Sequence, residues 1–326
     1  MKSLPRETSG APAPAWGHIA LVIVQFCFGL FPWIGKEAFV AFSPRVIVGW
    51  RLVVAAVFFG VIALAIHGRR VLLPPRVLLR IQVCALLGIV LNQLFFLEGL
   101  RLSTSTHAGI LMASIPVVTT CIAILVRQET LVLRRAIGIV AAFSGTFLLF
   151  FGEGFDFGRD TVRGDALMFC NVVLYSIYLV AMKPVLRTTP SLIVVAWVFV
   201  SSAWTVPLFA NRETWMPRHA DSGAWIALAA ILAFPTIIAY LFNLFALARV
   251  RASTVASYIF LQPVIAAAAG AVFLGERMTA WTMVAGVAIL VGLALITIPI
   301  RRRRVTGPGT DRDRRTDAPS PSSPAQ

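Results

Sequence analysis

The chain has 326 residues, of which 58% are hydrophobic and only 13% charged, and its mean hydropathy is +0.84. Soluble domains carry about 25% charged and about 45–50% apolar residues, so this composition argues against a soluble enzyme, a disordered protein and a disulfide scaffold. The net charge of +15 would suit a nucleic-acid binder. In a chain this apolar, it is better explained by cytoplasmic loops that collect Lys and Arg. We therefore expect a membrane protein without a nucleic-acid partner.

Ten apolar stretches are each long enough to cross a bilayer, which takes about 20 residues in a helix. None of them alternates with the period of two that a barrel strand would show, so we expect an all-α integral membrane protein with ten transmembrane helices. The predicted spans are 17–35, 45–66, 77–97, 108–126, 133–151, 164–186, 192–210, 225–246, 255–274 and 281–300.

The two ends of the chain differ in composition from its middle. Residues 1–16 are predicted to form a cytoplasmic N-terminal segment before an uncleaved first helix, and residues 152–163 an extracytoplasmic linker. Residues 301–326 begin with four arginines and continue through Gly, Pro, Ser and Asp, which predicts a disordered basic tail. With the N-terminus inside and the tail left out, 13 Lys and Arg lie inside against 8 outside. We therefore predict a multi-pass protein of the cytoplasmic (inner) membrane with both termini cytoplasmic.

A shift of 147 residues aligns rare residue types of the two halves without a gap. Chance identity from a biased composition is a weak explanation, because the chain has only 8 Trp and 7 Glu. Each half, 17–151 and 164–300, would hold five helices, and an odd number makes the second half enter the membrane from the opposite side. Such inverted repeats are typical of transporters, whose substrate binds near the midplane where the halves meet. The aligned pairs are Gly17 and Gly164, Lys36 and Lys183, Trp50 and Trp197, Pro116 and Pro263, Glu129 and Glu276, and Gly145 and Gly292.

The spans, the repeat and several local motifs together resemble the drug/metabolite transporter superfamily, EamA type. The stretches that carry the resemblance are Gly99 to Pro116 with Glu129, Ala246 to Pro263 with Gly275-Glu276, and Trp50-Arg51-Leu52. The resemblance covers about residues 17–300 and implies a secondary transporter that exports amino acids or similar amphipathic metabolites. One departure is Arg127-Gln128-Glu129, which lacks the first Gly of the family's Gly-Glu pattern. We expect that turn to have a different shape.

Motifs of enzymes are absent from the sequence, including His-Glu-x-x-His, Gly-x-Ser-x-Gly and the phosphate-binding Gly-x-x-x-x-Gly-Lys. The four cysteines lie in four different spans, without the spacing of metal ligands. We therefore expect no catalytic residue, no cofactor and no metal site. A polytopic membrane enzyme or sensor without transport activity is the alternative. The expected partners are a small-molecule substrate and the lipid bilayer, with a homodimer as a further option.

Uncharged polar side chains recur inside the spans at spacings that place them on one helix face, as Asn171, Tyr175 and Tyr178 do at i, i+4 and i+7. Amides and phenols beside aromatic rings suit a compact amphipathic solute, because they can replace its water while the rings cover its apolar part. For any single residue, hydrogen bonding between helices is the stronger alternative; for the set, we favour a substrate cavity. The candidates are Gln25, Phe28, Asn92, Gln93, Asn171, Tyr175, Tyr178, Tyr240, Asn243, Tyr258 and Gln262.

Three of the predicted spans have a proline near their middle. Pro116 and Pro263 lie near the middle of the fourth and ninth spans, where each leaves a carbonyl one turn earlier without its helical partner. Transporters use such broken helices to expose backbone polar groups to the substrate, so we predict helix breaks with a gating role. A kink that only shapes packing is the alternative. Pro235 predicts a further kink in the eighth span, without a counterpart in the first half.

Charged side chains within or beside the spans are few. Arg51 lies one to two turns into the second span, where it either extends to the outer headgroups or has a substrate or structural role. Glu98 and His107 lie near the outer face and could take up a proton, although solvation at the membrane edge is the simpler explanation. These three are the candidates for coupling. Glu129 and Glu276 are predicted to be structural, each ordering the turn before the next helix.

Overall fold

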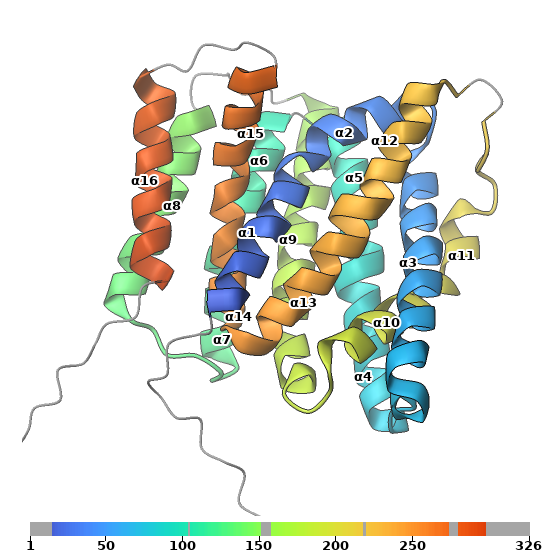
Figure 1. The fold of residues 1–326 in the computed structure, drawn as a ribbon. Helices are drawn as coiled ribbons and strands as arrows, with labels where there is room; N and C mark the ends of the chain where they lie inside the picture. Colours follow the sequence, from blue (N-terminus) through green and yellow to red (C-terminus); the bar gives the residue numbers. More distant parts are fainter. Residues whose placement is uncertain (1–14, 104, 151–157, 218–219, 274–279, 298–326) are drawn as a thin grey trace, which may run out of the picture.

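The computed structural model describes residues 15–103, 105–150, 158–217, 220–273 and 280–297, which form one helical bundle and no strand (Figure 1). The start of α1 and the end of α16 lie at the same end of this bundle (Figure 1). Residues 1–14 of the predicted N-terminal segment, residues 152–157 of the predicted linker, Glu276 and the predicted tail lie outside the described residues.

The described residues of the first half form eight α-helices, one 3₁₀ turn (η1) and one π-helical turn (η2). Their bounds are α1 Ala15–Gly29, α2 Phe31–Phe39, α3 Pro44–His67, η1 Gly68–Val71, α4 Pro75–Ala85, η2 Leu86–Leu91, α5 Asn92–Leu102, α6 Ser105–Ala113, α7 Ile115–Leu125 and α8 Leu133–Phe150. The second half contains α9 Arg159–Leu186, α10 Ser191–Ala203, α11 Val206–Ala210, α12 Ser222–Leu232, η4 Ala233–Ile238, α13 Ala239–Arg249, α14 Ala252–Ser257, η5 Tyr258–Phe260, α15 Leu261–Phe273 and α16 Ala280–Thr297. Because α9 begins at Arg159, the second part of the predicted linker is helical.

Eight stretches of the described chain are long and apolar enough to cross a membrane, and they coincide with eight of the ten predicted spans. They are Ala15–Phe39, Pro44–Val71, Pro75–Leu102, His107–Leu125, Arg159–Leu186, Ser222–Arg249, Ala252–Ala269 and Ala280–Thr297. The other two predicted spans, 133–151 and 192–210, correspond to α8 and to α10, which has only 13 residues. The total of ten therefore stays a prediction.

Helix bounds recur at the shift of 147 residues that aligns the sequence. The long kinked helix α4–η2–α5 covers Pro75–Leu102, and α12–η4–α13 covers Ser222–Arg249. α8 and α16 are related by the same shift at both ends. The start of α3 is fixed by a capping side chain, because Ser43 Oγ accepts a hydrogen bond from the Val46 N–H at 3.3 Å. The recurrence therefore extends from residue types to the positions where helices begin and end.

Both long kinked helices contain a wide π-helical turn, η2 in the first half and η4 in the second. Gly88 occupies in η2 the position, 147 residues earlier, that Pro235 occupies in η4. The prediction that the kink at Pro235 has no counterpart was therefore wrong. Gly88 is needed there for space, because a Cβ on it would overlap the Tyr178 side chain. Single π-helical turns inside α-helices often accompany functional sites.

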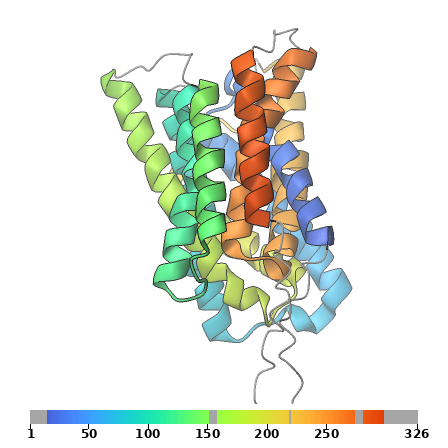
Figure 2. The ribbon, with the colours of Figure 1, turned by 90° about the vertical axis from the view of Figure 1, so that its left-hand side faces the viewer.

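α8 and α16 lie side by side on one face of the bundle (Figure 2). Their backbones approach closely at glycines. A Cβ on Gly292 would lie 2.6 Å from the carbonyl oxygen of Gly138, and one on Gly145 would lie 2.9 Å from that of Ala285. Small residues permit this approach in a membrane, where helices associate through packing rather than through release of water.

Candidate functional site

A cavity of about 240 Å³ lies inside the bundle, between helices of both halves of the chain. Its volume is close to the lower end of the range of about 300–1,000 Å³ that small-molecule sites occupy, so it suits a compact solute. Its lining residues are Gln25, Phe28, Gly29, Phe31, Arg51, Asn92, Gln93, Phe96, Leu100, Ala108, Gly109, Met112, Ala113, Ile115, Asn171, Tyr175, Tyr240, Asn243, Val255, Ile259, Gln262 and Pro263.

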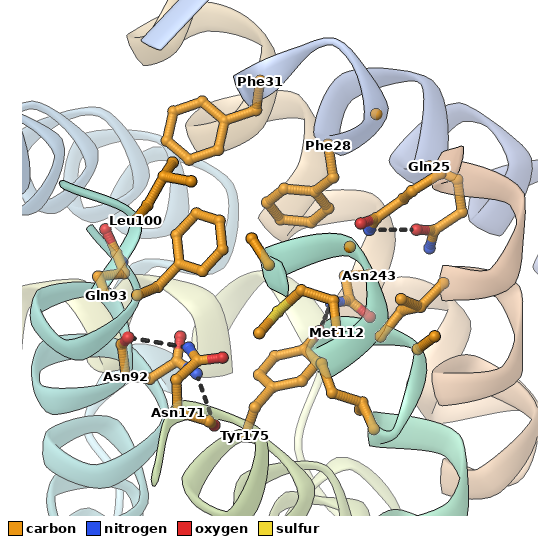
Figure 3. A pocket seen from close by; sticks show the side chains of 18 of the residues that line it. Gln25, Phe28, Phe31, Asn92, Gln93, Leu100, Met112, Asn171, Tyr175 and Asn243 are labelled. Atoms are coloured by element: carbon orange, nitrogen blue, oxygen red, sulfur yellow. Dashed lines mark hydrogen bonds between the residues drawn. The ribbon is translucent and has the colours of Figure 1, made fainter. Parts of the chain in front are cut away.

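Nine of the eleven residues that the sequence singled out line this cavity. They are Gln25, Phe28, Asn92, Gln93, Asn171, Tyr175, Tyr240, Asn243 and Gln262. Figure 3 shows side chains of α1, α5 and α9 facing one space, with Phe28 and Phe31 in the upper part of the view and Asn92 and Asn171 at its lower left. Gln25 Oε1 accepts a hydrogen bond at 2.8 Å from Nε2 of Gln262, a residue 237 positions away. The fold thus brings together residues that the sequence connects only by their polarity.

Asn92 and Asn171 join α5 to α9 by two reciprocal hydrogen bonds. Asn171 Nδ2 donates to the Asn92 carbonyl oxygen at 2.9 Å, and Asn92 Nδ2 donates to the Asn171 carbonyl oxygen at 3.3 Å. Because a carbonyl can only accept, the amide nitrogen of Asn171 must face Asn92. Its Oδ1 is then buried without a hydrogen-bond partner in the described part of the chain. The pair is therefore both a link between helices and a source of a free acceptor.

Two phenols also bind amides in the cavity wall. Asn243 Nδ2 lies 2.6 Å from Tyr175 Oη, and Gln93 Nε2 donates to Tyr240 Oη at 3.1 Å. Asn243 Oδ1 and Gln93 Oε1 are buried and, like Asn171 Oδ1, have no protein partner among the described residues. A buried polar atom without a partner costs about 1–3 kcal/mol, so three such acceptors beside one cavity indicate a functional reason.

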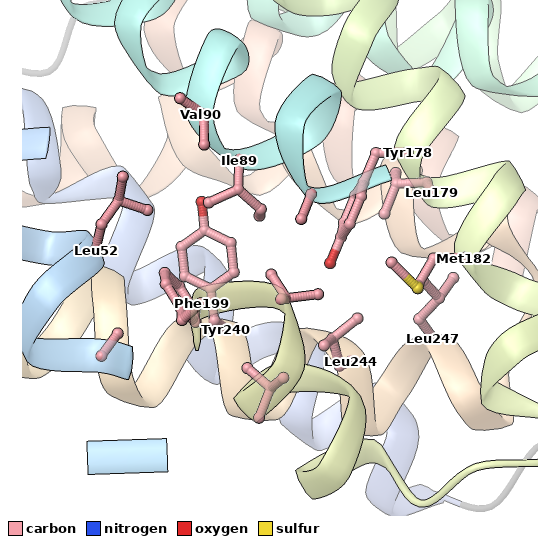
Figure 4. Close-up of a cluster of buried hydrophobic side chains, with 14 of the residues drawn as sticks. Leu52, Ile89, Val90, Tyr178, Leu179, Met182, Phe199, Tyr240, Leu244 and Leu247 are labelled. Atoms are coloured by element: carbon pink, nitrogen blue, oxygen red, sulfur yellow. The ribbon is translucent and has the colours of Figure 1, made fainter. Parts of the chain in front are cut away.

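Two predicted cavity residues, Tyr178 and Tyr258, do not line the cavity. Tyr178 lies two turns beyond Asn171, about 10.5 Å along the helix axis. It is buried in the apolar core below the cavity, near Leu179 and Met182 (Figure 4). Tyr258 Oη is instead 2.7 Å from His18 Nδ1. Spacing along a helix predicts the face that a side chain occupies but not the depth at which a cavity ends, which explains the position of Tyr178; Tyr258 contacts α1 instead.

Backbone breaks occur beside the cavity in both halves. α6 ends at Ala113 and α7 begins at Ile115, and Pro116 follows in the first turn of α7. In the second half, the 3₁₀ turn η5 separates α14 from α15, whose third residue is Pro263. Pro263 lines the cavity, whereas Pro116 is buried next to the lining residue Ile115. The predicted breaks are present, and their role in gating stays a prediction.

Arg51 points into the bundle rather than toward the membrane surface, and only 2% of it is exposed. Its Nε donates to Thr236 Oγ1 at 2.9 Å, and its Nη2 donates to the Pro235 carbonyl oxygen at 3.0 Å. Its Cζ lies 5.0 Å from the centroid of the Phe31 ring, within the range of a cation–π interaction. Arg51 therefore does not extend to the outer headgroups, and it lines the cavity.

Sequence reasoning missed part of the apolar wall of the cavity, including Phe96, Leu100 and Met112. Phe96 and Leu100 follow Asn92 at i+4 and i+8 on one helix face, so extending that pattern beyond polar residues would have found them. Met112 follows the lining residues Ala108 and Gly109 at i+4 and i+3 in α6, but none of these three is polar, so the search for polar faces passed over them.

Glu98 and His107 lie outside the cavity lining, near the end of the bundle where α5 ends. Glu98 Oε1 accepts from Arg45 Nε at 3.1 Å, an ion pair in which the arginine side chain is 52% exposed. His107 Nδ1 lies 2.6 Å from Asp165 Oδ2, which links α6 to α9. A coupling role for either residue stays a prediction.

Glu129 joins the two halves, because it contacts the start of α14, which lies at the end of the bundle opposite to the end of α5 (Figure 1). Its Oε2 accepts from Arg135 Nη1 at 2.8 Å and from the Ser253 hydroxyl, and its Oε1 accepts from the Ser253 N–H at 3.2 Å. The carboxylate thus caps the first turn of α14 in the second half and pairs with a residue of α8. The predicted role of ordering the turn before the next helix stays a prediction, and the link between the halves was not predicted.

The chain matches the sequence model of a known family, the EamA-like transporter family. The model matches twice, over residues 15–151 and 162–298. The chain belongs to the EamA-like transporter family. As a member of this family, and of the drug/metabolite transporter superfamily, it is a multi-pass membrane protein.

Relatives of this EamA-like protein carry the names of transporters. It is 26% identical over 226 residues to an uncharacterized transporter of Archaeoglobus fulgidus, a match that covers 67% of this chain and 76% of the relative. It is 23% identical to the uncharacterized transporter YyaM of Bacillus subtilis, with 76% and 84% covered, and 24% identical to the WAT1-related protein At3g30340 of Arabidopsis thaliana, with 86% and 84% covered. A crystal structure shares the fold, with a TM-score of 0.72 at 19% identity over 87% of this chain and 96% of that one. These relatives indicate a transporter of small molecules.

Proposed function

We propose that this chain is a secondary transporter that exports a small amphipathic metabolite, such as an amino acid, across the cytoplasmic membrane by alternating access. The cavity is its substrate site. The observation that carries this proposal is the position of the cavity, because its amides, phenols and aromatic rings come from both halves of the chain. Substrate sites of transporters with repeated halves lie at such a boundary. The direction of transport rests on the family resemblance.

The proposal includes ten membrane crossings, with α8 and α10 as the two that complete the set. The halves, residues 17–151 and 164–300, are then inverted, because each contributes five crossings. The shared bounds of Pro75–Leu102 and Ser222–Arg249, 147 residues apart, support this arrangement. Two similar halves in opposite orientation have two nearly equivalent packings, one open to each side.

Contacts at the two ends of the bundle suit such an exchange of access. At one end, Glu129 holds Ser253 of the other half. At the other end, Asp165 Oδ1 accepts from Ser103 Oγ at 2.6 Å, again across the halves. When one end opens and the other stays closed, the polar contacts at the opening end separate and those at the closed end remain. The helix breaks before Pro116 and Pro263 give each half a place to bend.

Transport in proteoliposomes tests the proposal. Purified protein is reconstituted, and flux of amino acids, bases and small drugs is compared with that of empty vesicles. We expect flux of at least one amphipathic solute. Asn243→Ala, which removes the amide beside Tyr175, should lower that flux by about tenfold, the effect of roughly one or two lost hydrogen bonds.

The matched control is Gln128→Ala, because Gln128 also donates an amide hydrogen bond to a helix, to the Val180 carbonyl oxygen at 3.3 Å, but lies outside the cavity lining. This variant should transport like the wild type. No flux of any solute above empty vesicles would contradict the transport function. Flux that Asn243→Ala leaves unchanged would contradict the assignment of the cavity as the substrate site.

A further inference from the structure

Arg51 carries a buried positive charge, and no carboxylate of the described residues forms an ion pair with it. It lies about two turns into α3 and is 2% exposed. Among the described residues, no Asp, Glu or His side chain lines the cavity. An arginine stays protonated in proteins, so the positive charge of Arg51 faces the cavity without a carboxylate from the described part of the chain.

The chain contains an internal comparison for this arrangement. Arg135 is also buried, at 9% exposure, but its Nη1 lies 2.8 Å from the carboxylate of Glu129. Charged groups inside a membrane protein are costly and are ordinarily paired. Of these two buried arginines, the one beside the cavity lacks the partner that the other has.

The guanidinium is nevertheless held in a fixed direction. Two of its nitrogens donate to Thr236 Oγ1 and to the Pro235 carbonyl oxygen, both in the π-helical turn η4, and Phe31 covers its face. Thr236 Oγ1 itself donates to the Ile231 carbonyl oxygen at 2.8 Å. The third nitrogen, Nη1, makes no hydrogen bond to the part of the chain that the structure describes. A preorganised guanidinium with free N–H groups is the arrangement that binds carboxylates best.

We infer that the transported solute carries a carboxylate and that Arg51 binds it; this inference rests on the proposed transport function. The carboxylate neutralises Arg51 when the cavity is occupied. The free acceptors Asn171 Oδ1, Asn243 Oδ1 and Gln93 Oε1 then suit a donor group on the same solute, and Phe28 and Phe96 cover its apolar part. Arg51 is thus the specificity-determining residue, and its connection to η4 makes it sensitive to the shape of the kinked helix.

Matched acid and amide pairs test the inference. The full-length protein in detergent is titrated with leucine and leucinamide, phenylalanine and phenylalaninamide, lactate and lactamide, and binding is followed by thermal shift, since a ligand of the folded state raises the unfolding temperature. At least one acid should bind about tenfold or more tightly than its amide, as expected for a charge-assisted hydrogen bond. Arg51→Gln should remove this preference, and Arg51→Lys should retain part of it.

Arg249→Gln is the matched control, because Arg249 also stacks on a phenylalanine, with its Cζ 3.4 Å from the Phe245 ring centroid, but does not line the cavity. It should keep the preference for the acid. A purely structural Arg51 would alter the unfolding temperature without ligand and leave the ratio of acid to amide affinity unchanged. The comparison of ligands on wild-type protein needs no variant, so it tests the need for a carboxylate even if Arg51→Gln fails to fold, and Arg51→Lys then tests the role of the residue.

The possible results separate this inference from the proposed function. If no acid binds more tightly than its amide while Asn243-dependent flux of a neutral or cationic solute is measured, the inference is overturned and the transport function stands. If no solute binds and none is transported, both are overturned. Equal preference for the acid in Arg51→Gln and in the wild type overturns the role of Arg51 alone.

Discussion

Gln93 donates a hydrogen bond from Nε2 to Tyr240 Oη at 3.1 Å, and the two residues are 147 positions apart, the same shift that aligns the two halves. In the proposed arrangement of inverted halves, two equivalent residues meet near the axis that relates the halves. Both line the cavity, so the cavity lies near that axis. Any change in the relative tilt of the halves must therefore alter the shape of the cavity.

Tyr240→Phe removes this hydrogen bond and leaves the Gln93 amide nitrogen unpaired. We expect the free energy of unfolding to fall by about 1–3 kcal/mol, the cost of an unsatisfied buried donor, and solute flux to fall with it. Tyr258→Phe is the control, because Tyr258 binds His18 outside the cavity lining. It should leave flux unchanged. Unfolding in detergent and flux in proteoliposomes measure the two effects, and a larger loss of flux in Tyr258→Phe would contradict the assignment.

Gly88→Ala should destabilise the protein, because the added methyl would overlap the Tyr178 side chain and the core must move to admit it. The expected loss is about 1–3 kcal/mol, as for other overpacked cores. Gly286→Ala is the comparison, since a Cβ on Gly286 meets nothing within 4 Å and alanine favours helix by up to about 1 kcal/mol over glycine. The thermal unfolding of both variants checks this, and a stability of Gly88→Ala equal to that of the wild type would show that η2 is not packed as described.

Glu129→Gln should be strongly destabilising, because it leaves the buried Arg135 without its carboxylate. Removal of one partner of a buried ion pair costs about 3–5 kcal/mol. Glu98→Gln breaks ion pairs with Arg45 and Arg101, whose side chains are 52% and 58% exposed, so it should cost about 1 kcal/mol or less. Equilibrium unfolding of the two variants compares them directly. Equal losses would argue against Glu129 as the link between the halves.

Arg127→Gly should stabilise the end of α7. Arg127 has a φ of 57°, and the bonds from Arg127 N to Ile124 O and from Gln128 N to Ala123 O, both 2.9 Å, form the helix-ending motif that favours glycine. A left-handed residue other than glycine costs about 1–2 kcal/mol, and the greater freedom of unfolded glycine offsets part of it. We expect a net gain of about 0.5–1 kcal/mol in the free energy of unfolding.

The control for this substitution is Arg127→Ala, which removes the same exposed charge but keeps the strained backbone. It should bring no gain. If alanine stabilises as much as glycine, the effect comes from the charge and not from the backbone. The expectation that the turn at Arg127-Gln128-Glu129 has a different shape stays a prediction, because its counterpart at 274–276 lies outside the described residues.

The sequence alone determined two kinds of property. One kind depends on residues that are close together in the chain, and the other depends on matching residue types 147 positions apart. The length of the apolar stretches predicted the eight spans that the structure supports. Rare residue types predicted the shift of 147 residues at which helix bounds also recur. The polarity of Asn171 and Tyr175 within an apolar helix marked them as members of a set that favours a cavity, and both line it, because a polar side chain in a membrane helix needs a polar neighbour.

Only the tertiary structure decided what depends on the partner helix. It put Tyr178 below the cavity, over Gly88 of another helix, and it turned Arg51 inward to meet η4. It also gave Glu129 a partner, Ser253, from the other half. In each case the local backbone leaves the side chain several directions open, and the choice is made by packing against residues more than 80 positions away.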